Sequence, residues 1–276
     1  MFIQFYPPKP LLASFIKGYQ IVHVQTPTGV PLPTHPFPPH AVQNLSFYPR
    51  DPIEVFHYGT RQRATAPSCI IVGPQLSRVD LTMGRDLLIV ATFFQPGGLH
   101  RLLGIPMSEL LDQALDASLL WNAQIRQVDQ QLRETTNYPQ MQQIVEAFLI
   151  RRLQQKQVEM RPIDAIFRLL EDPTRPVSLQ YLASQACLSP RQLERKFYER
   201  LGLGPKTFTR QVRFSQAIRL KEKQPDLDWL EVAVCCGYYD LAHMRRDFTE
   251  FAGSTPTLLL QEETQSLVRP YTSHNF

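Results

Sequence analysis

The pattern of apolar and polar residues changes character along the chain. In the amino-terminal part, four short apolar or alternating runs, each bounded by Pro or Gly, predict β-strands. These runs cover residues 42–49, 54–59, 68–74 and 87–98. The first 52 residues hold 11 of the 24 prolines, which excludes long helices there. The pattern therefore predicts a β-rich region built from extended segments and turns.

From Met107 onward the apolar residues recur mostly with the period of a helix. The clearest example is the segment 138–155, in which one apolar stripe is formed by Met141, Ile144, Val145, Phe148 and Leu149. Such a stripe is typical of a helix that packs on the protein's own core. A surface that pairs two copies of the chain is the alternative interpretation.

A polar, Gln-rich stretch at residues 154–161, followed by Pro162, predicts a domain boundary. Beyond it the pattern is helical throughout, with apolar residues at helical spacing in 163–170 and Ser178 as the N-cap of the next helix. The expected fold class is α+β. A β-rich amino-terminal domain with helices (1–155) precedes an all-α domain (156–276).

Two phrases within the second domain resemble each other, "LASQACLSPRQLERKFYERLGLGP" and "EVAVCCGYYDLAHMRRDFTEFAGSTP". Their structural positions match in pairs: Ala183 with Ala233, Ser189 with Asp240, Leu193 with Met244, Phe197 with Phe248, Gly202 with Gly253 and Pro205 with Pro256. Each copy reads as a short helix, a tight turn and a second helix, which is a helix-turn-helix. The units are expected at about 178–201 and 228–252, joined by a linker helix at about 205–223.

Local signals support these helix boundaries. Ser189 and Gln192 have the spacing of a capping box, with a proline at the first helical position between them. Asp228 and Glu231 have the same spacing before the second turn. Gly237 is free to take a positive φ as that helix ends, and Cys187 occupies the corresponding place in the first copy.

Helical spacing separates a buried face from an exposed face in each unit. The predicted core residues are Ala183, Leu193, Phe197, Ala233, Met244 and Phe248. The residues that point away from this core, and are candidates for reading DNA bases, are Arg191, Glu194, Arg195, Ala242, Arg245 and Arg246. Arginine can bond guanine with two hydrogen bonds, and glutamate can accept one from cytosine. The candidates for phosphate contacts are Lys196, Arg200, Lys206 and Arg210.

The charge distribution agrees with a polyanionic partner for this region. The net charge is +4, and the window 175–251 holds 13 basic residues against 9 acidic ones, while the rest of the chain holds 16 of each. Within the window, residues 189–223 carry 10 basic and 3 acidic residues. Such a local positive field attracts nucleic acid. A solvated basic surface without a partner is the alternative.

Residues 161–256 resemble the DNA-binding domain of the AraC/XylS family of bacterial transcription regulators. The resemblance rests on the two phrases quoted above, with the alanine, the Leu-x-x-x-Phe spacing, the glycine and the proline in place. It implies seven helices, double-stranded DNA and RNA polymerase as partners, and no cofactor or enzymatic activity. The cytosol is the expected compartment, and the direction of control, as activator or repressor, is open. Leu241 and Ala242 depart from the polar base readers of the family, and the usual ending after Pro256 is replaced by "TLLLQEE".

The amino-terminal region resembles, more loosely, an effector or oligomerisation domain found in one branch of these regulators. The resemblance lies in "FYPPKPLLASFIKGYQ" and "ATFFQPGGLHRLLGIPMSELLDQ". It implies that this domain senses an unidentified small molecule or pairs two copies into a homodimer. No membrane partner is expected, because the longest apolar run, residues 87–94, is too short to cross a bilayer.

Other kinds of chemistry have weaker signals. His35, His40 and His57 could converge as metal ligands on a cupin-like barrel, although no close histidine pair supports this. The "QPGGLH" segment is a weak candidate for a phosphate loop. The four cysteines show no metal or disulfide spacing, and no GxSxG motif is present. The alternative function is an enzyme or metal-binding protein that a helix-turn-helix domain localises to DNA.

Overall fold

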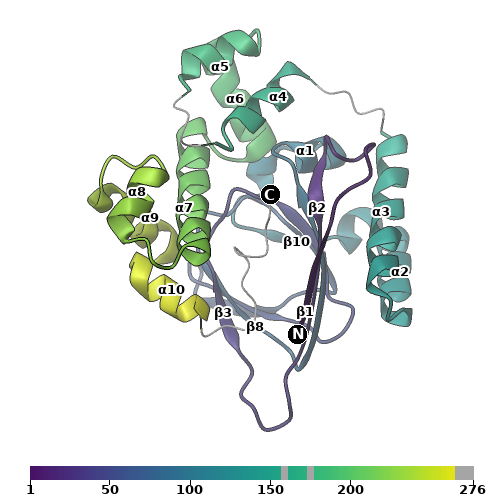
Figure 1. The fold of residues 1–276 in the computed structure, drawn as a ribbon. Coiled ribbons are helices and arrows are strands. Elements are labelled where there is room, and N and C mark those ends of the chain that lie inside the picture. The colour runs from purple at the N-terminus through teal and green to yellow at the C-terminus, as the bar shows by residue number, and fades with distance from the viewer. Residues whose placement is uncertain (157–160, 173–176, 265–276) are drawn as a thin grey trace.

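The computed structural model describes residues 1–156, 161–172 and 177–264. A β-sheet domain with two flanking helices is followed, within these ranges, by a set of seven helices that lie along one side and one end of the sheets (Figure 1). This is the α+β class that the sequence predicts. The predicted domain boundary near 154–161 falls partly outside the described residues.

The strands form two antiparallel sheets. The larger sheet has the order β1 (Phe2–Tyr6), β2 (Ile16–Gln25), β9 (Asp86–Phe94), β4 (Asn44–Phe47), β7 (Cys69–Val72) and β10 (Ala114–Asp116). The smaller sheet has the order β3 (Thr34–Phe37), β8 (Val79–Thr82), β5 (Glu54–His57) and β6 (Gln62–Thr65). All four strands predicted from the sequence are present, as β4, β5, β7 and β9. The pattern did not predict β2, which is the longest strand.

Strand β2 shows how the alternation of side chains positions the larger sheet. Tyr19 and Ile21 point to one face and join the apolar core under the two long helices. Val22 and Val24 point to the other face, where they pack in a second core with residues of both sheets. Because successive side chains of a strand point to opposite faces, one strand supplies both cores.

Helices α2 (Ser118–Glu134) and α3 (Tyr138–Gln154) cover the outer face of the larger sheet (Figure 1). In the apolar stripe of α3, Met141, Val145, Phe148 and Leu149 are buried in the core beneath the sheet, and Ile144 is partly buried against it. The interpretation of this stripe as protein core is therefore confirmed. The alternative of a free pairing surface is wrong, because the stripe is already covered by the chain's own strands.

Seven helices lie in the described part of the chain after residue 160, the number that the family resemblance implies. They are α4 (Pro162–Leu169), α5 (Leu179–Gln185), α6 (Pro190–Leu201), α7 (Pro205–Lys223), α8 (Trp229–Cys235), α9 (Leu241–Ala252) and α10 (Pro256–Thr264). They form two small cores that share α7. Phe208 and Val212 of α7 belong to the first core, with α4 to α6, and Phe214 and Ile218 belong to the second, with α8 to α10.

The "QPGGLH" segment is a packing site in this structure. Gly97 adopts a positive φ of 77° before the short helix α1 (Gly98–Leu103). A Cβ on Gly97 would lie 3.2 Å from the ring of Phe167 in α4, and one on Gly98 would lie 2.2 Å from the carbonyl oxygen of Phe15. The glycines therefore allow close packing, and nothing in this geometry supports the phosphate loop considered above.

Candidate nucleic-acid interface

The first helix-turn-helix unit consists of α5, a four-residue turn and α6. The side chain of Ser189 accepts a hydrogen bond from Gln192 N, and the side chain of Gln192 accepts one from Ser189 N. This is the capping box that the sequence predicts, and it fixes the start of α6. Cys187 takes a positive φ of 54° in the turn, which lets Leu188 N donate to the Ala183 carbonyl at 2.9 Å.

The second unit repeats this arrangement in α8 and α9. Gly237 takes the positive φ, at 74°, and Tyr238 N donates to the Ala233 carbonyl at 2.9 Å. Asp240 caps α9 through a 2.6 Å bond from His243 N. The same backbone bond to a small buried alanine therefore closes the turn in both units, which explains the spacing repeated in the sequence.

The residues predicted to form the core of the two units are all buried. All six side chains are buried to within 2% exposure: Ala183, Leu193, Phe197, Ala233, Met244 and Phe248. The alanines allow the first helix of each pair to approach the second closely, and the larger side chains fill the space between them. Since these contacts are internal to each unit, the opposite face of each second helix is left to solvent.

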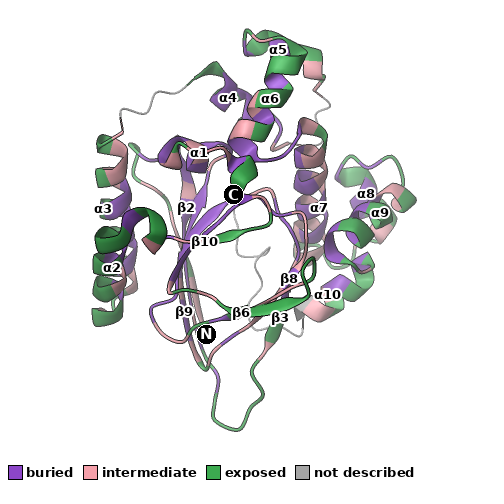
Figure 2. Ribbon diagram, turned by 180° about the vertical axis from the view of Figure 1, so that it is seen from behind, coloured by how far each residue is buried: buried purple, intermediate pink, exposed green. Residues whose placement is uncertain are grey.

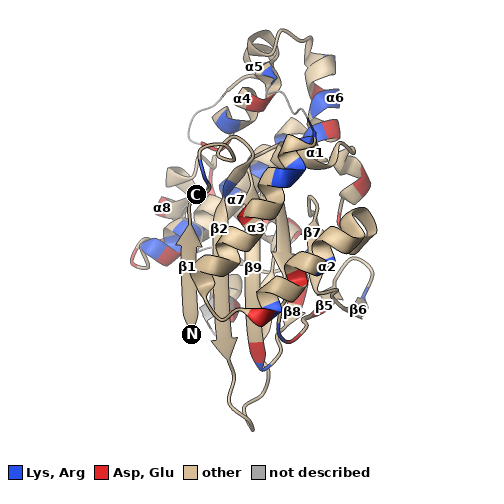
Figure 3. Ribbon diagram, turned by 90° about the vertical axis from the view of Figure 1, so that its right-hand side faces the viewer, with Lys and Arg blue, Asp and Glu red and all other residues tan. Residues whose placement is uncertain are grey.

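That opposite face carries the residues predicted to read bases, and all six are exposed: Arg191, Glu194, Arg195, Ala242, Arg245 and Arg246. Helices α5 and α6 project from one end of the molecule with exposed outer positions (Figure 2). Figure 3 shows basic positions on α6 at that end. The structure therefore leaves these side chains accessible, while their contacts with bases stay a prediction.

Two of the four residues predicted to contact phosphate form ion pairs within the chain instead. Arg200 is 4% exposed and forms a buried ion pair with Asp164 of α4. Arg210 of α7 forms ion pairs with Asp247 and Glu250 of α9. The pKa of Arg210 is raised mainly by its hydrogen bond to Glu250, and the bond to Asp247 acts in the same direction. These two guanidinium groups hold helices together. Lys206 is exposed and Lys196 is half-buried beside Glu199, so both stay candidates.

One surface residue of the second unit, Tyr239, is not among the residues predicted from the sequence to contact DNA. Tyr239 is 92% exposed and directly precedes the N-cap of α9. Its ring therefore has little contact with the protein, at the start of α9. The signal in the sequence was an aromatic residue next to the capping aspartate of a turn.

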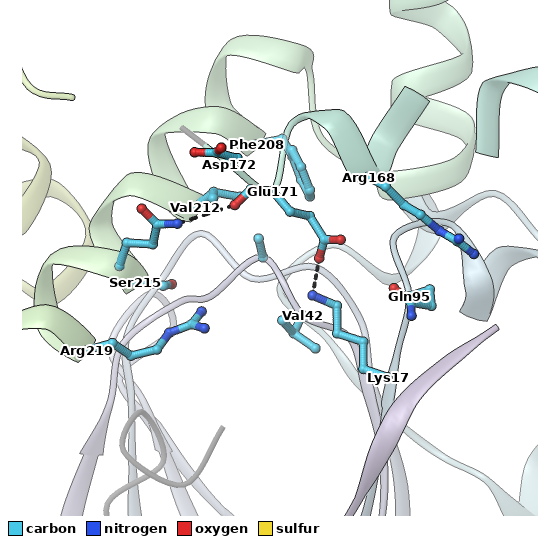
Figure 4. Close-up of a pocket in the computed structure, with 12 residues that line it drawn as sticks. Lys17, Val42, Gln95, Arg168, Glu171, Asp172, Phe208, Val212, Ser215 and Arg219 are labelled. Carbon is cyan, nitrogen blue, oxygen red and sulfur yellow. Dashed lines mark hydrogen bonds and ion pairs between the residues drawn. The ribbon is translucent and has the colours of Figure 1, made fainter. Parts of the chain in front are cut away.

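The amino-terminal domain contacts the helical domain across a cleft of about 410 Å³ (Figure 4). Lys17 of β2 forms an ion pair with Glu171, which follows α4. Ser215 and Arg219 of α7 line the opposite side of the cleft. Helix α4 with the residues that follow it, the linker helix α7 and the sheet domain therefore meet around one cleft.

A second cavity, of about 110 Å³, lies between the two sheets of the amino-terminal domain. His35 and His57 both line it. Within the described ranges, no group of three or more His, Cys, Asp or Glu residues is arranged to hold a metal ion. The four cysteines are free thiols. None of the helices that the structure describes combines the length and hydropathy needed to cross a bilayer.

Two capped helix pairs that share one linker helix are the arrangement of a DNA-binding domain, and this class of domain indicates a transcription regulator. Residues 182–262 match the family model described as "Helix-turn-helix domain", and this part of the chain is a helix-turn-helix domain of the AraC type. Residues 4–116 match the model described as "Domain of unknown function (DUF6597)". A search of curated proteins found no significant match.

The fold is similar to that of ToxT from Vibrio cholerae, with a TM-score of 0.50 and 11% identity over 88% of this chain and 98% of that one. ToxT from Vibrio cholerae O395 bound to (E)-4-(8-methylnaphthalen-1-yl)but-3-enoic acid matches with a TM-score of 0.50 and 12% identity, over 88% and 98% of the two chains. The DNA-binding domain of AdpA in complex with a target DNA matches with a TM-score of 0.36 and 27% identity, over 38% and 96%.

Proposed function

We propose that the protein is a transcription regulator in which both helix-turn-helix units of one chain read one asymmetric DNA site, under the control of a small molecule. The observation that carries the first part is the shared helix α7. Its first half is buried in the core of one unit and its second half in the core of the other. A single rigid helix therefore sets the separation of the two recognition helices.

The length of α7 fits this role. It has 19 residues, and no Gly or Pro interrupts it after its first position. At 1.5 Å per residue it spans ~28 Å. Successive major grooves on one face of DNA repeat every ~34 Å. Units at the two ends of the helix therefore lie at about the separation needed to enter adjacent grooves of one duplex.

The exposed faces of α6 and α9 give the two halves of the site different strengths. Arg191 and Arg195 of α6 are suited to guanine, and Glu194 between them to cytosine. In α9, Ala242 offers only an apolar contact, so recognition there rests on Arg245 and Arg246. Lys206 and Lys196 supply phosphate contacts, which position the protein without reading sequence. The first unit is expected to contribute the stronger element.

The amino-terminal domain is proposed to sense a small molecule rather than to pair two chains. The apolar stripe of α3, the surface that the sequence offered for pairing, is used in the chain's own core. The domain instead encloses the cavity between its sheets. ToxT, which has a similar fold, binds a naphthyl butenoic acid in one of its structures, and this supports a ligand response here. We further propose contact with RNA polymerase, as the family resemblance implies.

Selection of binding sites from random DNA by the full-length protein tests this proposal. The expected result is an asymmetric site of about two helical turns, with a strong element at one end and a weaker one at the other. A palindromic site would indicate two chains with one unit each. Enrichment of no sequence at all would contradict a sequence-specific regulator.

A further inference from the structure

The cavity between the sheets is mainly apolar and has buried polar atoms along its wall. An engineered apolar cavity of about 150 Å³ binds benzene, so about 110 Å³ corresponds to a ligand of about one ring. The apolar wall comes from strands of both sheets and includes Val22, Ile53, Val55, Ile70, Leu81, Met83 and Ile89. A ligand there would be held mainly by burial of apolar surface.

Three polar side chains on this wall have hydrogen-bonding atoms without a partner among the described residues. These atoms are Nε2 of Gln20, both ring nitrogens of His35 and Oε1 of Gln75. All three residues are more than nine-tenths buried. A buried polar atom without a partner is costly, so such atoms are normally satisfied. Together they offer both donors and acceptors to a molecule in the cavity.

The wall carries no Asp, Glu, Lys or Arg among the residues that the structure describes. Burial lowers the pKa of His35 to about 3, with the nearby charge of Arg78 acting in the same direction, so its imidazole is neutral at physiological pH. An anion would lose its hydration here, and the nearby cation, Arg78, is already paired with Asp80 and Glu262. The chemistry of the wall therefore favours an uncharged ligand.

Gln75 also contacts the DNA-binding domain, through its backbone. Its carbonyl oxygen accepts a 2.5 Å hydrogen bond from Nε2 of Gln211, a fully buried residue of the linker helix α7. The side chain of Gln75 lines the cavity, so one residue lies between the cavity and α7. A ligand that repositions Gln75 would therefore act on the helix that both recognition units share.

The residues on either side of Gln75 reach both units. Pro74 packs so closely on Gly202, the C-cap of α6, that a Cβ on that glycine would lie 2.4 Å from Pro74 Cγ. Arg78 donates from Nη1 to the carbonyl of Ala252, at the end of α9, at 3.3 Å, and forms a 2.8 Å ion pair with Glu262 of α10. The segment 74–78 thus touches α6, α7, α9 and α10.

We propose that the segment 74–78 transmits occupancy of the cavity to both helix-turn-helix units, and that the effector is a small uncharged molecule of about one ring with a hydrogen-bonding group. This inference rests on the proposed function. A ligand bonded to Gln75 and His35 shifts the segment, and the shift changes the positions of α6 and α9 relative to each other. DNA affinity then depends on the cavity.

The ligand class is tested with phenol, benzene and benzoate, which share one ring and differ in polarity and charge. Calorimetry on the full-length protein at pH 7.5 is expected to show phenol binding at least tenfold more tightly than either of the others. Gln75→Met preserves the backbone carbonyl and should reduce phenol affinity by about tenfold, the effect of about 1.4 kcal/mol for one lost hydrogen bond. Benzene or benzoate binding as tightly as phenol would overturn the ligand class.

Coupling between the cavity and the DNA-binding units is tested by measuring the affinity of the protein for the selected DNA site with and without saturating phenol. The wild-type affinity is expected to change at least fivefold, the lower range of allosteric coupling. Gln211→Leu and Arg78→Met should each reduce this change below twofold while phenol still binds within twofold of wild type. Arg63→Met, on the exposed strand β6, is the matched control and should retain the full change.

Each remaining outcome has a definite meaning. A wild-type response below fivefold, or a full response in both Gln211→Leu and Arg78→Met, would overturn transmission through this segment. If the wild-type protein selects no DNA sequence, the proposed function fails. The calorimetric comparison of phenol, benzene and benzoate does not depend on DNA, so the two failures are distinguishable.

Discussion

Arg210 of the linker helix and Asp247 of the second recognition helix form an ion pair that joins α7 to α9. Nε and Nη2 of Arg210 lie 2.9 and 2.7 Å from the same carboxylate oxygen, Oδ1. Asp247 is 1% exposed, and Glu250 binds the outer side of the same guanidinium. The direction in which α9 presents its exposed face therefore depends on a residue of the linker helix.

Arg210→Met is expected to lower the free energy of unfolding by about 2–4 kcal/mol, because it leaves a buried carboxylate without its cation. Urea unfolding of the full-length protein measures this effect. Lys206→Met, at an exposed position of the same helix, is the control and should change stability by less than about 0.5 kcal/mol. If Arg210→Met left stability unchanged and only weakened DNA binding, the original assignment of Arg210 to a phosphate contact would be restored.

Gly202 and Gly253 end the two recognition helices with similar positive φ values of 72° and 67°. A Cβ on Gly253 meets nothing within 4 Å, whereas one on Gly202 would lie 2.7 Å from the carbonyl oxygen of Met107. Gly253→Ala should therefore cost only the backbone strain, about 1–2 kcal/mol. Gly202→Ala should cost about 1–3 kcal/mol more, because it also disrupts packing against the amino-terminal domain. Equal losses in urea unfolding would contradict this contact between the domains.

The free energy of unfolding should decrease at acidic pH because of His35. Its pKa is lowered by burial to about 3 in the folded protein, against an ordinary value of about 6.5. The unfolded chain therefore binds more protons between these values, so the contribution is complete above about pH 6.5 and decreases as the pH falls towards 3. His35→Phe should reduce the difference in unfolding free energy between pH 7.5 and pH 5 by about 1–2 kcal/mol. An unchanged difference would indicate that His35 is not buried and neutral.

The features that could be predicted from the sequence are those set by neighbouring residues. The capping box of Ser189 and Gln192, the turn at Gly237 and the buried face of each helix all depend on residues a few positions apart. Strand β2 was missed because Gly18 and Gln20 interrupt its apolar run, although the strand is buried on both faces. Local patterns also do not indicate which strands come together around the cavity.

The two arginines that were predicted to contact phosphate and are found in ion pairs share one explanation. Arg200 pairs with Asp164 and Arg210 with Asp247, across 36 and 37 residues of sequence. An arginine near a recognition helix has the same local signature whether it binds phosphate or a distant carboxylate. Burial of the acidic partner decides between these roles, and burial follows from the tertiary structure.

Two substitutions distinguish a residue that reads bases from a residue that contacts the phosphate backbone. Arg195→Ala should weaken binding to the selected site by about 1–3 kcal/mol and relax preference at one base pair, as expected for a lost bidentate contact. Lys206→Ala should weaken binding to all sequences about equally and reduce the salt dependence. Affinities measured on the selected site and on single-base variants, at two salt concentrations, check both. A uniform loss in both variants would contradict the division of roles.

The central claim, that one chain reads both elements through the rigid helix α7, is tested most directly by changing the spacing between the two elements of the selected site. Five inserted base pairs rotate one element to the opposite face of the duplex and should abolish its contribution. Ten inserted base pairs return both elements to the same face of the duplex but move them apart by about one further turn, ~34 Å. A single helix of fixed length cannot span this added distance. The account predicts that neither insertion binds like the original site. Full affinity with ten inserted base pairs would show that the two elements are read by different chains, and would contradict the claim.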